Sequence, residues 1–147
     1  MKFCNHCGRL YDERDGGKCK CRREKREYRH IKFYDTPGWR ALSRFIKTRD
    51  YLHDRLAMYF MKYEPANDVE KKLCDYLIDA QGQARQMGGV LIVHHIMERE
   101  KEPGRAYDQD NLITLNYHTH EYVHQLYNSN KSAVQDLLFK AVRAELP

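Results

Sequence analysis

The chain has 147 residues, of which 41% are hydrophobic and 32% charged, and its mean hydropathy is −0.86. No apolar run approaches the roughly 20 residues of a membrane span and no internal repeat is present, so the composition predicts a soluble protein with one compact domain and a small additional module. The net charge of +5 conceals an excess of cations in residues 1–50, which contain 15 Lys and Arg against 7 Asp and Glu, whereas residues 51–147 contain 11 against 14. A polyanion is therefore expected to dock on the N-terminal part of the chain.

Four cysteines near the N-terminus predict a structural zinc site, with Cys4 and Cys7 as one pair and Cys19 and Cys21 as the other. Thiolates favour tetrahedral zinc, and two close pairs separated by a short loop are typical of a zinc ribbon or knuckle. The second pair departs from the usual CxxC spacing, and His6 could replace one thiolate. Because no signal peptide precedes the pairs, a reducing cytosol and hence zinc are expected in preference to disulfides. Metal binding would supply most of the folding free energy of so small a segment.

A basic stretch follows these cysteines, over residues 20–32. Tyr28 and His30 lie among its Lys and Arg residues, an arrangement that favours contact with nucleic acid. Phosphate contacts give affinity without reading base sequence, and the side chains expected to make them are Arg22, Arg23, Lys25 and Arg26. A solvated linker is the alternative interpretation of the same charges.

Three helices are predicted in the next part of the chain. The first begins at Asp35-Thr36-Pro37, where a capping side chain precedes a proline, and Trp39 is expected to anchor it in the core. The second is expected to end near Pro65, and the third to follow Asn67-Asp68. Cys74, within the third, is expected to be a small buried hydrophobic residue. The apolar positions that recur at helical spacing are Trp39, Leu42, Phe45 and Ile46 in the first helix, Leu52, Leu56, Tyr59, Phe60 and Tyr63 in the second, and Val69, Leu73 and Leu77 in the third.

Two strands and two further helices are predicted after Gly88-Gly89. The apolar, β-branched run Val90–Val93 predicts a strand that leads into His94 and His95. A charged loop over 97–110 then precedes a short strand over Leu112–Leu115. One helix is expected over about 117–128, and after Asn128-Ser-Asn130 a final amphipathic helix carries Val134, Leu137, Leu138 and Val142.

The most informative pattern consists of Asn111 and of four histidines, which are His94, His95, His120 and His124. His120 and His124 are spaced i, i+4, which places both imidazoles on one face of a helix, where they can bind one metal ion. His94 and His95 are adjacent in an extended segment, so one side chain can bind metal while its neighbour faces a substrate. Taken singly, such histidines are more often packed or surface residues. Their joint occurrence, with Asn111 between the two pairs, favours a metal site.

This pattern resembles the HNH endonuclease family, whose ββα-metal site consists of a strand ending in two polar residues, a loop, an Asn and a helix with the final His. The resemblance extends from about Trp39 to His124, and the three-His version is similar to the colicin-type nucleases. The sequence around it is similar to the HNH proteins of phages and prophages. The resemblance implies that His94, His120 and His124 are the metal ligands. It also implies that His95 is the general base and that Asn111 orients this base.

The chemistry of this family explains the residue types. Hydrolysis of a phosphodiester at neutral pH requires a nucleophile, neutralisation of charge on the phosphate and help for the leaving oxygen. One divalent ion, Mg²⁺, Mn²⁺, Ni²⁺ or Zn²⁺, on three histidines would leave positions for the phosphate and leaving oxygens. His95, with an ordinary pKa of about 6.5, can take a proton from water near neutral pH. His118 lies one residue off the metal-binding face and is interpreted as a surface histidine or a phosphate contact.

These patterns together predict an α+β fold, with a ββα-metal HNH core flanked by helices and a small N-terminal zinc-binding module. The expected organisation is a zinc-ribbon-like module with a basic linker over 1–34 and a nuclease domain over 35–147, which comprises a helical part over 35–85, the ββα core over 88–128 and a C-terminal helix over 130–145. The resemblance implies a metal-dependent endonuclease that cleaves double-stranded DNA in the cytoplasm of a bacterial host cell, with phage packaging proteins as further partners. The alternative is a non-cleaving HNH-like zinc protein that binds DNA or a partner protein. A histidine at the base position favours cleavage.

Overall fold

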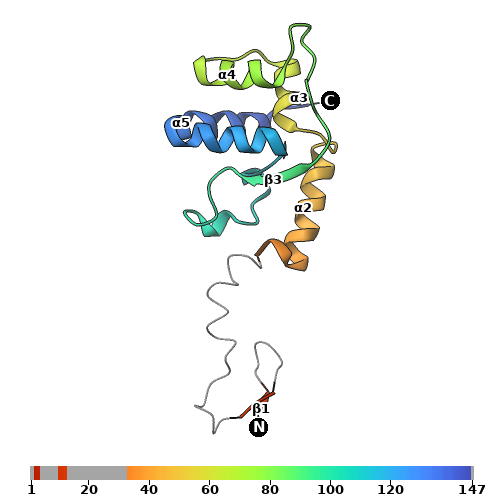
Figure 1. The fold of residues 1–147 in the computed structure, drawn as a ribbon, viewed down its shortest axis with the longest axis vertical. Helices are drawn as coiled ribbons and strands as arrows, with labels where there is room; N and C mark the ends of the chain where they lie inside the picture. The colour runs from red at the N-terminus through yellow and green to blue at the C-terminus, as the bar shows by residue number, and fades with distance from the viewer. Residues whose placement is uncertain (1, 4–9, 13–32, 147) are drawn as a thin grey trace. The chain divides into compact units, whose positions relative to one another are not determined.

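The structure, a computed structural model, describes residues 2–3, 10–12 and 33–146 (Figure 1). The chain divides into two compact units, Met1–Arg40 and Ala41–Pro147. The elements in chain order are β1 (Lys2–Phe3), β2 (Leu10–Tyr11), the 3-10 turn η1 (Phe33–Asp35), α2 (Pro37–Arg49), α3 (Arg55–Lys62), α4 (Asp68–Leu77), β3 (Leu91–His95), the 3-10 turns η2 (Pro103–Arg105) and η3 (Gln109–Asn111), β4 (Leu112–Asn116) and α5 (Tyr117–Arg143). This is an α+β fold in which an antiparallel two-stranded hairpin packs against a long C-terminal helix.

The first unit contains the short antiparallel pair of β1 and β2, in which Lys2 lies opposite Tyr11 and Phe3 opposite Leu10. The predicted zinc ligands and the predicted phosphate-binding cations lie outside the described residues. The predictions of a zinc module and of a DNA-binding basic stretch therefore stay predictions.

Helix α2 begins as predicted. The Thr36 hydroxyl accepts a hydrogen bond from the Trp39 amide at 3.2 Å, and Pro37 occupies the first helical position. The Trp39 side chain is 5% exposed, and its ring lies 5.3 Å from that of Phe33 and 5.5 Å from that of Tyr34. The expected role of Trp39 as a buried anchor is thus confirmed.

The end of α2 differs from the prediction. Tyr51 and Leu52 both adopt left-handed backbone conformations, with φ of 58° and 57°. The Leu52 amide bonds to the Lys47 carbonyl at 2.8 Å and the Tyr51 amide to the Thr48 carbonyl at 3.0 Å, which is the closing pattern of a Schellman turn. This turn leaves the Leu52 side chain 60% exposed. The assignment of Leu52 to the apolar face of the second helix is therefore wrong.

Phe45 is a second departure, because its side chain is 53% exposed although its spacing suggested the apolar face of α2. Ile46, the next residue, is fully buried. Successive positions on a helix point about 100° apart, and the part of α2 that faces the core includes Ile46 but not Phe45. The chain buries Ile46.

Helices α3 and α4 begin at side-chain caps. Asp54 accepts a hydrogen bond from the Ala57 amide at 3.0 Å, and Asn67 accepts one from the Glu70 amide at 2.9 Å. The end of α3 at Lys62 agrees with the predicted end near Pro65, and α4 follows Asn67 as predicted. Cys74 is half-buried and packs at the edge of the hydrophobic core.

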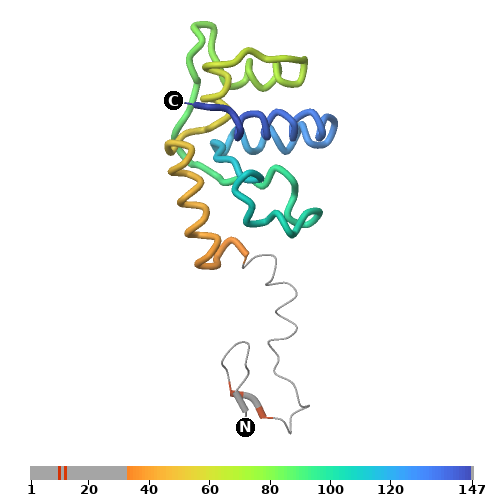
Figure 2. The backbone as a smooth tube through the Cα atoms, turned by 180° about the vertical axis from the view of Figure 1, so that it is seen from behind, coloured from red at the N-terminus to blue at the C-terminus, as the bar shows by residue number. Residues whose placement is uncertain are grey.

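The hairpin pairs β3 with β4 in a register that sets His94 opposite Ile113 and His95 opposite Leu112. β3 begins one residue later and ends two residues later than the predicted strand over Val90–Val93, so both histidines belong to β3 itself. β4 ends one residue later than predicted. Figures 1 and 2 show α5 lying between α4 and the hairpin. One face of the hairpin is thereby covered by α5.

Two helices were predicted to separate near residues 128–130, and α5 consists of two helical segments that meet there. Asn130, at the junction, has a non-helical backbone (φ −136°, ψ 38°), so the predicted boundary is present. The second half of α5 supplies much of the core, together with α3, α4 and the hairpin. Its fully buried side chains are Val134, Leu137, Leu138 and Ala141.

The outer edge of β4 is closed by side chains from the connection between α2 and α3. Asp50 accepts a hydrogen bond from the Thr114 amide at 2.9 Å, and Asp54 accepts one from the Asn116 amide at 3.0 Å. Arg49 donates to the Leu112 carbonyl at 2.7 Å. These three bonds take the place of a third strand, which satisfies backbone groups that a sheet edge would otherwise leave unpaired.

Burial raises the pKa of the Asp54 carboxyl, while hydrogen bonds from Thr119, Asn116 and Ala57 act in the opposite direction. Asp50 is held by an ion pair with Arg55 at 2.9 Å. Arg55 also donates to the Ala141 carbonyl at 2.8 Å, near the end of α5. The two buried carboxylates thus join β4, α3 and the C-terminus of α5.

Candidate metal centre

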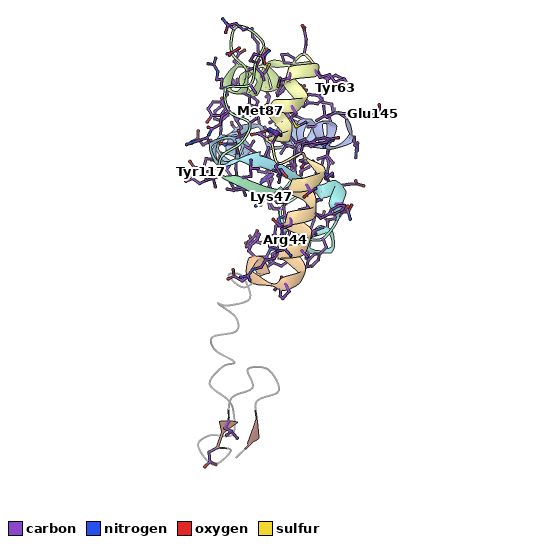
Figure 3. The ribbon with its side chains drawn as sticks, turned by 90° about the vertical axis from the view of Figure 1, so that its right-hand side faces the viewer. Arg44, Lys47, Tyr63, Met87, Tyr117 and Glu145 are labelled. Atoms are coloured by element: carbon purple, nitrogen blue, oxygen red, sulfur yellow. The ribbon has the colours of Figure 1, made fainter. Side chains whose placement is uncertain are left out.

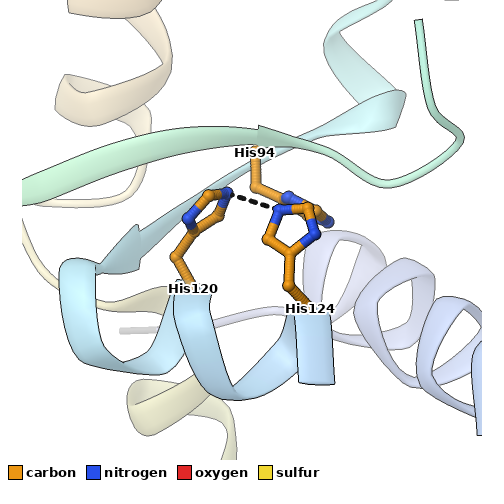
Figure 4. Close-up of side chains that lie close together, drawn as sticks. All are labelled: His94, His120 and His124. Carbon is orange, nitrogen blue, oxygen red and sulfur yellow. Dashed lines mark hydrogen bonds between the residues drawn. The ribbon is translucent and has the colours of Figure 1, made fainter. Parts of the chain in front are cut away.

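Three histidines meet between the hairpin and α5. Their candidate ligand nitrogens all lie within 4.8 Å of one another, and the Nε2 atoms of His120 and His124 are 3.0 Å apart (Figure 4). His94 comes from β3, and the other two come from the first turns of α5. The sequence brings them together because β4 leads directly into the helix. The helix starts at once because Asn116 caps it, its side chain accepting a hydrogen bond from the His118 amide at 2.9 Å.

The surroundings keep two of these imidazoles, those of His94 and His120, neutral. His94 is 4% exposed, and burial, followed by the neighbouring His120, His124 and His95, holds its pKa well below the ordinary value. Burial and the nearby His124 lower the pKa of His120 to about 4, against a smaller opposing effect of Glu121. Neutral imidazole is the form that binds a metal ion, so His94 and His120 have the required protonation state at neutral pH.

Tyr127 fixes which nitrogen of His94 carries the proton. The Tyr127 hydroxyl donates to the Ile96 carbonyl at 2.9 Å, and the same hydroxyl lies 3.0 Å from His94 Nε2. A phenol has one proton, so the hydroxyl must accept the second bond from an Nε2–H group of His94. The lone pair of His94 is therefore on Nδ1.

Tyr127 was not among the predicted site residues. Its spacing could have indicated it, because Tyr127 follows His120 at i+7 and His124 at i+3 and so lies on the same face of the helix. Gln135 adds a second donor to the Ile96 carbonyl, at 3.0 Å. Tyr127 and Gln135 lie on opposite sides of the kink at Asn130. Both halves of α5 therefore hold the segment that follows His94 and His95.

The cluster fits a divalent metal ion on the chemistry of its donors. Two nitrogens on one tetrahedral ion at about 2.0–2.1 Å from the metal lie about 3.3 Å apart, close to the 3.0 Å between His120 and His124. Three imidazole ligands suit zinc and other divalent transition metals and leave coordination positions for non-protein ligands. Beside the cluster, Ile92, Tyr117, Glu121 and Gln125 line an open groove that also contains His120 and His124.

His95 lies on the opposite face of β3 and is 6% exposed. Its Nε2 is 3.0 Å from the Ala106 carbonyl, which can only accept, so Nε2 carries the proton and Nδ1 the lone pair. Burial lowers the pKa of His95, assisted by the charge of Arg99 and opposed by the bond to Ala106. The imidazole is thus neutral and has a defined tautomer.

Asn111 is fully buried and holds the loop between the strands. Its side-chain oxygen accepts from the Met97 amide at 2.8 Å, and its nitrogen donates to the carbonyls of Met97 at 3.1 Å and Arg105 at 3.2 Å. Arg105 is bonded directly to Ala106 in the chain, and the Ala106 carbonyl holds His95. Asn111 therefore acts on His95 through the loop.

His118 is exposed and lies outside the three-histidine cluster. It lines a separate pocket with Arg85, Tyr76 and Thr119. None of the helices in the described part of the chain combines the length and apolar character needed to cross a bilayer.

Comparisons of the chain with protein-family models, with curated proteins and with solved structures found no match. The geometry of the site is a β-hairpin followed by a long helix, with three histidines gathered between them.

Proposed function

We propose that the chain is a metal-dependent endonuclease of the HNH, ββα-metal type, phage- or prophage-derived, which hydrolyses DNA phosphodiester bonds with one metal ion and a histidine general base. The observation that carries the proposal is the convergence of His94, His120 and His124, together with the defined tautomer of His95, the residue that follows His94 in β3. A surface cluster of histidines would have no need of the hydrogen bonds that orient His94 and His95.

A divalent ion held by His94 Nδ1 and by the imidazoles of His120 and His124 would stabilise negative charge on the phosphate and on the departing 3′-oxygen. Tyr127 keeps His94 in the tautomer that offers Nδ1 to this ion. Burial at His94 and His120 keeps protons from competing for the ligand nitrogens.

In this proposal His95 accepts a proton at Nδ1 from the attacking water. The Ala106 carbonyl holds the opposite nitrogen, and the lowered pKa keeps the ring unprotonated near neutral pH. Asn111 keeps the Met97–Arg105 loop closed, which positions the Ala106 carbonyl. His95 is thus the catalytic base, and Asn111 is a positioning residue.

We further propose that the N-terminal segment binds zinc and DNA. A structural Zn²⁺ on Cys4, Cys7, Cys19 and Cys21 would fold the first segment, and the cations after it would bind phosphates. Double-stranded DNA is the proposed substrate, and phage packaging proteins are proposed partners.

A plasmid-nicking assay with Mg²⁺, Mn²⁺, Ni²⁺ and Zn²⁺ tests the proposal. Supercoiled DNA should be converted to nicked or linear forms, and His95→Ala should reduce the rate by at least about 10²-fold because the general base is lost. Metal affinity, measured by calorimetric titration, should survive in His95→Ala and be lost in His120→Ala. DNA binding without cleavage by the wild-type chain in all four metals would instead identify a non-cleaving binding protein.

A further inference from the structure

Five side chains in the second half of α2 and in the turn after it, four of them exposed and one half-buried, take no part in the core or in the metal centre. We call it the α2 surface, and it consists of Arg44, Phe45, Lys47, Tyr51 and Leu52. Arg44 is exposed and Lys47 half-buried, and Figure 3 labels both on α2. The three apolar side chains are 53%, 53% and 60% exposed, in chain order.

The charge of the surrounding segment is one-sided. Residues 41–63 contain five Lys and Arg, whereas their two carboxylates, Asp50 and Asp54, are fully buried and bonded to β4. No carboxylate of this segment therefore reaches the surface. Residues 64–147 contain 9 Lys and Arg against 13 Asp and Glu. Arg49 and Arg55 are paired with Asp50, so the cations left at the surface of this segment are Arg44, Lys47 and Lys62. The rest of the second unit is acidic.

The turn after α2 presents large apolar side chains at a conformational cost. Glycine adopts a left-handed backbone without strain, whereas Tyr51 and Leu52 occupy it with φ of 58° and 57°. Neither side chain regains this cost by burial. Exposed aromatic rings and cations in one segment are the composition with which proteins contact the bases and sugars of nucleic acid as well as the phosphates.

The position of α2 places this surface close to the proposed reaction centre. Arg49, at the end of α2, donates to the Gln109 carbonyl at 2.8 Å and to the Leu112 carbonyl at 2.7 Å. Leu112 is the cross-strand partner of His95. The helix end that carries the α2 surface is thus bonded to the same end of the hairpin as His95.

We propose that the α2 surface binds double-stranded DNA, with Arg44 and Lys47 contacting backbone phosphates and Tyr51 contacting a base or sugar. The choice of DNA as partner rests on the proposed nuclease function. The surface itself is inferred from charge, exposure and the strained turn. It supplies phosphate contacts from the folded second unit, in addition to those proposed for residues 20–32.

Fluorescence anisotropy with a labelled 20-base-pair duplex tests this surface. Both variants are made in the full chain carrying His95→Ala, so that cleavage does not interfere. The test variant is Arg44→Gln/Lys47→Gln, and the control is Lys71→Gln/Lys72→Gln, which removes the same charge from exposed positions of α4. The test variant should bind at least about tenfold more weakly and flatten the slope of log affinity against log salt by about 1.8, since each phosphate contact contributes about 0.9. The control should change affinity less than about twofold.

Equal losses in the two variants would overturn the proposal, because they would show a general effect of net charge. Unchanged affinity in the test variant, or no duplex binding by the chain at all, would overturn it as well. If only the test variant loses DNA affinity and the wild-type chain does not nick plasmid, the α2 surface binds DNA but the proposed nuclease function is rejected. Cleavage by an Arg44→Gln/Lys47→Gln chain that binds DNA normally would reject the surface alone.

Tyr51→Gly separates the aromatic contribution from the charges. Glycine relieves the left-handed strain, so the melting temperature should rise while DNA affinity falls several-fold. A rise in melting temperature with unchanged DNA affinity would show that Tyr51 does not contact DNA.

Discussion

The two halves of α5 differ in what they contribute, since the first carries two of the proposed metal ligands and the second packs in the core. Before the kink at Asn130, the helix carries His120 and His124 on a face that is half-buried to exposed. After the kink, Val134, Leu137 and Leu138 are fully buried in the core. Metal ligands must be accessible and must be held in fixed positions. His120 and His124 can meet both requirements because they lie on the accessible half of a helix whose other half is packed in the core.

The largest expected effect is the loss of stability caused by a substitution in the second half of α5. Leu138→Ala should lower the free energy of unfolding by about 2–5 kcal/mol, because it leaves a cavity in a fully packed region. Chemical denaturation with urea measures this change. The folded fraction should still bind metal with nearly the wild-type affinity. A selective loss of metal affinity in folded Leu138→Ala would show that the two halves are not separable.

The opposite result is expected for the first half. His120→Ala should reduce metal affinity by more than about 100-fold, since a direct ligand matters more than a second-sphere partner. Its free energy of unfolding without metal, measured with urea, should stay within about 0.5 kcal/mol of the wild type, because the side chain is only half-buried. Adding metal should stabilise the wild-type chain and not the variant. A large loss of metal-free stability would place His120 in the core network.

Tyr127→Phe tests the partner that holds His94. It removes the hydroxyl that accepts from His94 Nε2, so metal affinity should fall by about 10–100-fold. Tyr122→Phe is the matched control, because Tyr122 packs on the same helix against the core and stacks on Tyr76. Its metal affinity should not change.

Nitrogen-15 NMR of the imidazoles adds a readout that a purely structural role of Tyr127 would not move. The wild-type chain should contain His94 as the Nε2–H tautomer, and Tyr127→Phe should lose this preference. An Nδ1–H tautomer in the wild type would contradict the assigned ligand atom.

The smallest expected effect lies where the two halves meet. Gln135→Ala removes one of the two donors to the Ile96 carbonyl, while Tyr127 continues to satisfy it. The free energy of unfolding should fall by about 0.5–1.5 kcal/mol, and metal affinity by less than in Tyr127→Phe. Paired denaturation and titration measurements would show this order. A greater loss of metal affinity in Gln135→Ala than in Tyr127→Phe would mean that the second half of α5 also positions the ligands.

Local patterns in the sequence were sufficient for most of the elements. The caps at Thr36 and Asn67 predicted where α2 and α4 begin, and the polar run at 128–130 predicted the position of the kink. The i, i+4 spacing of His120 and His124 predicted their convergence. These features depend on contacts within a few residues, which the amino-acid order determines directly.

Only the tertiary structure decided which distant groups meet. Leu52 left its predicted helix because a turn closed on Lys47, and Asp50 and Asp54 became partners of β4 across more than 60 residues of chain. The approach of His94 to the helix pair depends on the hairpin register and on the packing of α5, and so do the tautomers set by Tyr127 and by the Ala106 carbonyl. A hydrogen bond between residues far apart in the chain has no local pattern, because it forms only where packing has already brought donor and acceptor together.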